Sequence, residues 1–250
     1  MARFIVSVLI GLAMAAISVT PTSAQSFSPA QKQTIDQLIH DYLQEHPEAI
    51  VESLRAAQAK AIAERLERQR QAVVAKRDEL LFDPDSAVGG NPKGKVTLVE
   101  FFDYRCPYCK AIEPSLETLM KENSELRVVY KEFPILGPAS VFASRVAIAA
   151  QHQGKYLEFH NRMMALRGTV DDNEVLKVAK DCGLDMIRLE SDVKSAEIDK
   201  VIHRDYALAD ALGINATPGL VVGDRVTMGA IDIDGLRKLI AAARPSKKAM

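Results

Sequence analysis

Residues 96–110, VTLVEFFDYRCPYCK, place a run of apolar residues directly before a pair of cysteines. Val96 to Phe102 is short and almost wholly apolar, which is typical of a strand buried on both faces of a sheet. Pro107 to Glu122 has the pattern of a helix, and Leu126 to Phe133 is a second apolar run. The order strand, helix, strand predicts a βαβ unit, with the cysteines where the first strand meets the helix.

Cys106 and Cys109 form a Cys-x-x-Cys pair at the start of this predicted helix. Unpaired backbone N–H groups and the helix dipole favour a thiolate at Cys106, and Pro107 fits the first turn. Cys109 follows one turn later, where it can attack a mixed disulfide formed at Cys106. Half of a zinc site and an inert structural bridge are the alternatives. Zinc needs two further ligands, and only Cys182 and five scattered histidines remain. We therefore predict no metal and no cofactor.

The rest of the chain beyond the βαβ unit is helical in pattern over residues 138–212 and then returns to strand. Leu220–Val222 and Val226–Met228 flank a Gly-Asp turn, so they predict a hairpin. A closing helix is expected from about Asp234 to Ala243. The tripeptide Ala-Thr-Pro, residues 216–218, stands just before the hairpin.

Three segments resemble the DsbA-like branch of the thioredoxin superfamily: residues 101–110 (FFDYRCPYCK), residues 128–134 (VVYKEFP) and Thr217-Pro218. The resemblance covers roughly residues 95–245. It implies an α/β protein, a thioredoxin fold with an inserted helical domain, preceded by an N-terminal helical region. It also implies thiol–disulfide exchange as the activity.

The same resemblance implies roles for residues outside the cysteine motif. Pro218 is the cis-proline that faces the active site, and the Thr217 backbone pairs with an extended substrate segment as an added strand. Glu100 is the buried acid beneath Cys109. A carboxylate in an apolar strand has a raised pKa, so it can accept and return the Cys109 proton near neutral pH. The alternative for Glu100 is a strand-end residue that reaches water.

Pro107 and Tyr108, between the cysteines, bear on the direction of the reaction. The stronger oxidants of the family place His third in the motif, where it stabilises the thiolate, and Tyr108 cannot supply that charge. Cys-Pro-Tyr-Cys with Thr217 before the cis-proline resembles the periplasmic isomerases. We therefore favour a disulfide isomerase or reductase acting on exported proteins with cysteines and kept reduced by a membrane redox partner protein. The alternatives are a dithiol oxidase and, in another class, a copper(I)-binding or holdase protein.

The first 24 residues have the pattern of a signal peptide. Arg3 supplies the charged start, Phe4 to Val19 is apolar, and small residues end at Ala24, where cleavage is expected. An uncleaved membrane anchor is the alternative, but an apolar run of about sixteen residues is shorter than the roughly 20 that span a bilayer. Export to the periplasm is the prediction.

Residues 28–81 read as helix almost throughout, with Ser28-Pro29 as a capping start and Pro47 between two helices. Their apolar stripe is thin and rich in Ala, so these helices either pack on their own domain or meet copies of themselves. Resemblance to the suppressor-of-copper-sensitivity C proteins favours a homo-oligomer formed through residues 28–81. The turn-rich residues near 83–94 mark a boundary. We expect a helical oligomerisation region over 25–85 and a DsbA-like domain over 86–250, with its insertion at about 138–212.

The overall composition argues against other classes of protein. Lys and Arg number 32 and Asp and Glu 33, a net charge of −1 without any Trp, so nothing in it attracts nucleic acid. Three cysteines, two of them in one motif, are too few for a disulfide-stapled scaffold. Cys182 is interpreted as a small buried hydrophobe, and the histidines as solvated or structural (His40, His46, His152, His160, His203).

Overall fold

The computed structural model describes residues 27–244, so the signal peptide predicted over 1–24 lies outside the described residues. The chain forms two compact units, of which the first ends at Ala59 and the second begins at Lys60. In the part of the chain that is described, no helix is long and apolar enough to cross a membrane.

The first unit contains α1 (Pro29–Glu45) and the beginning of α2 (Pro47–Ala75). The expected capping box is present: the Ser28 hydroxyl accepts from the Gln31 N–H at 3.3 Å, and the Gln31 side chain accepts from the Ser28 N–H at 2.9 Å. Pro47 opens α2 at its first position. None of the side chains of α1 is buried, so the apolar stripe of this helix has no cover within the described unit.

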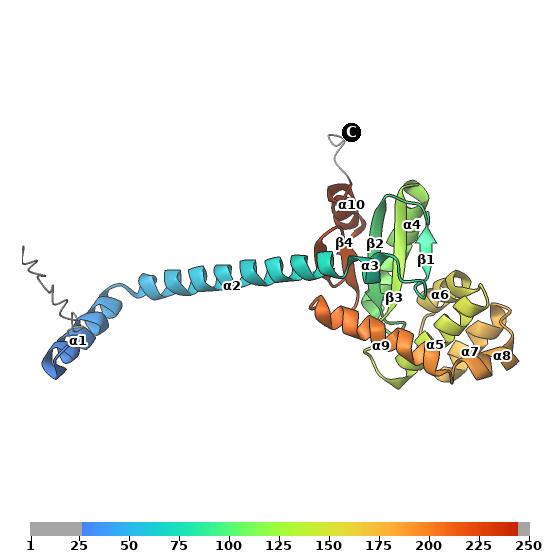
Figure 1. Cartoon of the computed structure of the whole chain (residues 1–250), viewed down its shortest axis with the longest axis horizontal. Helices are drawn as coiled ribbons and strands as arrows, with labels where there is room; N and C mark the ends of the chain where they lie inside the picture. Colours follow the sequence, from blue (N-terminus) through green and yellow to red (C-terminus); the bar gives the residue numbers. More distant parts are fainter. Residues whose placement is uncertain (1–26, 245–250) are drawn as a thin grey trace, which may run out of the picture. The chain divides into compact units, whose positions relative to one another are not determined.

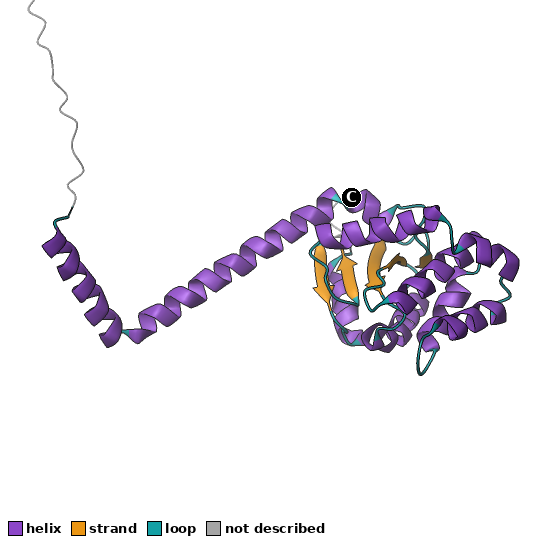
Figure 2. Cartoon of the chain, turned by 90° about the horizontal axis from the view of Figure 1, so that it is seen from below, coloured by secondary structure: helices purple, strands orange, loops and turns teal. Residues whose placement is uncertain are grey.

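The second unit is built on a five-stranded sheet in the order β1-β3-β2-β4-β5. Figure 2 shows strands of this sheet with helices packed around them. The parallel pair β2 (Val96–Phe102) and β3 (Leu126–Glu132) is joined by α4 (Pro107–Glu122), which confirms the predicted βαβ unit. The hairpin is β4 (Gly219–Val222) and β5 (Arg225–Met228), and β4 runs antiparallel to β2. This mixed sheet, with β2 at its centre, is a thioredoxin fold.

One strand of the sheet was not predicted. β1 (Val88–Gly90) pairs antiparallel with β3 at the sheet edge, with Val88 opposite Val129. Its two glycines suggested a turn, because glycine punctuates most turns. Gly90 has φ +69°, and a Cβ there would lie 2.6 Å from the Leu126 carbonyl oxygen, so this position in the edge strand requires glycine.

Helices cover both faces of the sheet. One face carries α4 and α10 (Ile233–Ala242), and its core continues into the insertion, whose helices α5 to α8 gather beyond the sheet (Figure 1). The other face carries α3 (Arg77–Leu81) and α9 (Ala196–Ala211). The insertion helices are α5 (Pro138–His152), α6 (Tyr156–Ala165), α7 (Asp172–Asp181) and α8 (Met186–Asp192). Side chains alternate along β2, so Glu100 points into the first of these layers.

The unit that carries the sheet begins well before residue 86, where the sequence placed its boundary. Val73 and Leu80 are buried among apolar residues of the second face (Val99, Phe101, Leu208, Leu212, Val221). The buried Lys131 also forms an ion pair with Asp83, with Nζ of Lys131 2.8 Å from Oδ2 of Asp83. Val73 and Leu80 therefore add to the core of the second unit, because they cover part of the sheet face that also carries α9, whereas Ile62 and Leu66 remain more than half exposed.

Candidate active site

Cys106 lies at the N-cap of α4, in an extended backbone conformation, with Pro107 at the first helical position. Its sulfur accepts a hydrogen bond from the Cys109 backbone N–H at 3.5 Å. The Cys106 S–H donates to the Thr217 carbonyl oxygen at 3.3 Å. The fold thus brings together the cysteine motif and the Thr-Pro loop, which lie 111 residues apart in the chain.

The two cysteines have opposite acidities. The pKa of Cys106 is lowered to about 6, chiefly by a hydrogen bond from the Cys109 side chain and further by the backbone N–H groups of Tyr108 and Cys109. Burial raises the pKa of Cys109 far above its ordinary value, and the hydrogen bond with Cys106 and the charge of Glu100 raise it further. At neutral pH, the Cys106 thiol is therefore largely ionised, as an attacking thiol requires, whereas Cys109 holds its proton.

Glu100 is fully buried on β2, so it is not the strand-end residue that reaches water. Neither oxygen of its carboxyl group has a hydrogen-bond partner among the described residues. Burial raises the pKa of Glu100 well above its ordinary value, and the neighbouring Glu113, Cys106 and Glu132 raise it further. A carboxyl group with this environment can hold or release a proton beside Cys109.

Four buried polar side chains near Glu100 were missed at the level of the sequence. Glu113 follows Cys109 by one helical turn, and its Oε2 lies 3.5 Å from Nε2 of His160 on α6. The other nitrogen of His160 lies 3.2 Å from the Tyr104 hydroxyl, which donates at 3.4 Å to Glu132. The i, i+4 spacing from Cys109 was the available signal for Glu113. His160 is fully buried and therefore structural rather than solvated.

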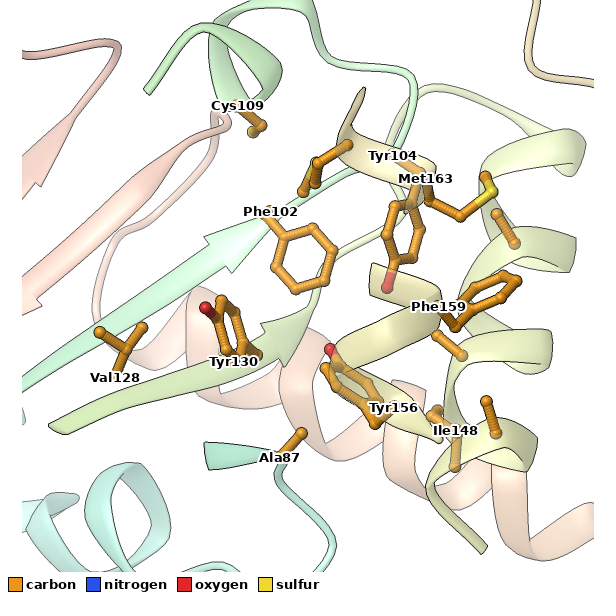
Figure 3. Close-up of a cluster of buried hydrophobic side chains, with 14 of the residues drawn as sticks. Ala87, Phe102, Tyr104, Cys109, Val128, Tyr130, Ile148, Tyr156, Phe159 and Met163 are labelled. Carbon is orange, nitrogen blue, oxygen red and sulfur yellow. The ribbon is translucent and has the colours of Figure 1, made fainter. Parts of the chain in front are cut away.

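Aromatic rings surround this polar group and exclude water from it. Figure 3 shows Phe102 below Cys109, with the hydroxyl groups of Tyr104 and Tyr156 directed toward each other. Both hydroxyls donate to the same oxygen of Glu132, Tyr156 at 2.7 Å. Burial raises the pKa of Glu132 to about 8. The insertion therefore contributes directly to the layer beneath the cysteines, through Tyr156 and His160 of α6.

The loop facing Cys106 has the expected form. The Thr217–Pro218 peptide bond is cis, and β4 starts at the next residue, Gly219. A Cβ at Gly219 would lie 2.5 Å from Cγ2 of Ile214, so that side chain fills the space a bulkier residue would need. Tyr108 is 61% exposed beside the cysteines. Cys182 is buried at the C-cap of α7, as expected for a small hydrophobe.

Comparison with known proteins matches this architecture to one family. The family model described as "DSBA-like thioredoxin domain" matches residues 97–241. A thioredoxin-like oxidoreductase from Silicibacter pomeroyi is 42% identical, covers 67% of this chain and 97% of its own, and has a TM-score of 0.66. ScsC from Proteus mirabilis, in a transitional conformation, is 29% identical, covers 87% of this chain and 97% of its own, and has a TM-score of 0.65.

A curated relative is much longer than this chain. The Na(+)/H(+) antiporter NhaA 3 of Salinispora tropica is 28% identical over 169 residues, which are 66% of this chain and 26% of the antiporter. The chain thus spans about a quarter of the length of the curated relatives that it matches.

Proposed function

The chain belongs to the family of DsbA-like thioredoxin domains, which are thiol–disulfide oxidoreductases, and we propose that it isomerises or reduces wrong disulfides in exported proteins in the periplasm. The observation that carries this proposal is the contrast between the acidic thiol of Cys106 and the protonated, buried thiol of Cys109. Tyr108 between them is uncharged, so it adds no cation to stabilise the reduced form.

The reaction starts when the Cys106 thiolate attacks one sulfur of a client disulfide. The Cys106–client bond forms, the client S–S bond breaks, and the released client sulfur leaves as a thiolate. In isomerisation, another client thiolate attacks the mixed disulfide and releases Cys106, so no electrons are transferred overall. In reduction, Cys109 passes its proton to Glu100 and attacks the Cys106 sulfur, which breaks the Cys106–client bond and releases the client sulfur as a thiolate. The client then gains two electrons, the enzyme forms the Cys106–Cys109 disulfide, and a membrane redox partner reduces it again.

The Thr217 backbone is the proposed docking edge for the client. Its carbonyl oxygen lies 3.3 Å from the Cys106 sulfur, and the segment enters β4 two residues later. An extended client segment that pairs with Thr217 would place its sulfur next to Cys106.

A second candidate, a dithiol oxidase, is favoured by the low pKa of Cys106 itself. Interactions that stabilise the thiolate also stabilise the reduced enzyme, so they make its disulfide a stronger oxidant. The two directions therefore depend on the reduction potential and on access to other redox proteins.

Self-association through the N-terminal helices is part of the proposal. The large apolar side chains of the first unit are mostly more than half exposed (Leu38, Ile39, Tyr42, Ile50, Leu54). Exposing several large apolar side chains to water is energetically unfavourable, and contact between copies of the chain would bury them. An assembly would hold several Cys106 thiols around one client.

Refolding of a scrambled multi-disulfide protein tests the proposal, with the mature chain compared with a variant that lacks residues 25–59. We expect the mature chain to be oligomeric by light scattering and to restore native disulfides, and the truncated chain to be monomeric and to oxidise reduced substrate instead. A monomeric mature chain would refute the oligomer. Copper(I) binding without turnover on either substrate would favour the binding-protein alternative.

A further inference from the structure

A pocket of about 440 Å³ opens beside the start of α4. One wall is formed by Arg105, Pro107 and Lys110, and the other by the loop between α6 and α7, which includes Arg167. Three of the residues lining this basic pocket are cations, and none is an acid. Pro107 directly follows Cys106, so the pocket adjoins the attacking thiol.

Two cations of the basic pocket are oriented by backbone carbonyl groups, and among the described residues no carboxylate lies within ion-pair distance of either. The Arg105 guanidinium donates to the Leu136 carbonyl at 2.6 Å, and the Lys110 ammonium donates to the Leu166 carbonyl at 2.8 Å. Carbonyl oxygens orient these groups but leave their charge uncompensated. Burial lowers the pKa of Lys110, and the charge of Arg167 lowers it further, so an anion in the pocket would be stabilised.

The buried carboxylate of Asp103 offsets only part of this charge. Asp103 is buried and accepts from the Arg105 N–H at 2.7 Å, the Ser140 hydroxyl at 2.8 Å and the Leu136 N–H at 2.9 Å. The single negative charge of Asp103 offsets one of the three positive charges of Arg105, Lys110 and Arg167, so the pocket keeps an excess of about two positive charges. Asp171, beyond the loop, caps α7 through the Glu174 N–H at 3.0 Å.

We infer that the basic pocket is a specificity subsite that binds Asp or Glu side chains next to the reacting cysteine of a client polypeptide. This inference rests on the proposed thiol–disulfide exchange at Cys106. A client segment whose sulfur reaches Cys106 carries its neighbouring residues past Pro107. Arg and Lys side chains pair favourably with carboxylates, and such pairs mainly increase the rate of association and the selection among partners.

The test compares cysteine peptides that differ only in the two residues flanking the cysteine: Glu, Gln or Lys. Each peptide is presented as a mixed disulfide with 2-thiopyridine, which is an uncharged leaving group. The Cys106 thiolate attacks the peptide sulfur and expels 2-thiopyridone, and Cys109 then attacks Cys106 and releases the peptide thiol. The enzyme dithiol is oxidised as the pyridyl disulfide is reduced, so electrons balance, and the released 2-thiopyridone reports the rate.

We expect the reduced enzyme to react about tenfold faster with the Glu peptide than with the Gln peptide at low salt, and slowest with the Lys peptide. The preference should shrink in high salt. Arg167→Glu should reverse it, and Arg167→Gln should weaken it. The matched control is Lys121→Glu, which makes the same charge change on an exposed side chain at the other end of α4 and should leave the preference intact.

Equal rates for all three peptides, or an Arg167→Glu enzyme that keeps the preference of the Lys121→Glu enzyme, would overturn the subsite. Those outcomes would still be consistent with thiol–disulfide exchange at Cys106, because 2-thiopyridone would still be released. Failure to release it from any peptide would instead refute the proposed exchange at Cys106.

Discussion

The Cys109 side chain should control the acidity of Cys106, and replacing Cys109 by Ala tests this directly. A hydrogen bond from Cys109 is the largest influence that lowers the pKa of Cys106 to about 6. A hydrogen bond to a charged group contributes about 1.5–3 kcal/mol, which corresponds to roughly one to two pKa units. In the Cys109→Ala enzyme the pKa of Cys106 should therefore rise to about 7–8.

The assay is the pH dependence of Cys106 alkylation by iodoacetamide, since only the thiolate reacts. At pH 6 about half of native Cys106 is thiolate, so Cys109→Ala should react roughly fivefold to fiftyfold more slowly. Cys109→Ser keeps a donor at the position and should stay close to the native midpoint, and Cys182→Ala serves as the control for the remaining thiol. An alanine variant with an unchanged midpoint would show that the helix start alone sets the acidity of Cys106.

Three further outcomes follow from buried groups. Glu100→Gln should slow resolution by Cys109 without unfolding the domain and remove the pH dependence of that step; a single-turnover pH–rate profile that matches the native one would make Glu100 merely structural. For Glu132, burial raises the pKa to about 8, so between about pH 5 and pH 8 the unfolded state binds fewer protons than the folded state, and stability falls as pH rises. Glu132→Gln should flatten this decline in urea denaturation, whereas parallel profiles for the two proteins would contradict it. Val73→Ala should lower the free energy of unfolding by about 2 kcal/mol, because the Val73 side chain is only 4% exposed. The adjacent Val74 is 59% exposed, so Val74→Ala should change the urea midpoint little. Equal effects of the two substitutions would mean that the end of α2 does not pack on the sheet.

The sequence predicted most of the fold because its strands and turns carry strong local signals. The apolar run Val96–Phe102 and the helix Pro107–Glu122 have the expected bounds, since the cysteine motif with Pro107 marks the helix start. The polar layer beneath Cys109 was recognised only at Glu100. Glu132 and His160 stand in strands and helices whose pattern shows which face is apolar, but a pattern cannot show which polar side chains from distant elements meet inside that face.

The same limit explains why the start of the second unit was placed too late along the chain. Helical periodicity identifies an apolar side on α2 but not the surface that covers it, so Leu54 and Val73 look equivalent in the sequence although one is exposed and the other buried. The difference comes from the second face of the sheet, where the apolar side chains of β2 and β4 need more cover than α9 provides. A deletion ending at residue 81 would therefore remove Val73 and Leu80 and damage the core of the catalytic unit. A deletion ending at residue 59 removes no buried side chain among the described residues, so loss of isomerase activity in that variant would reflect lost self-association rather than unfolding.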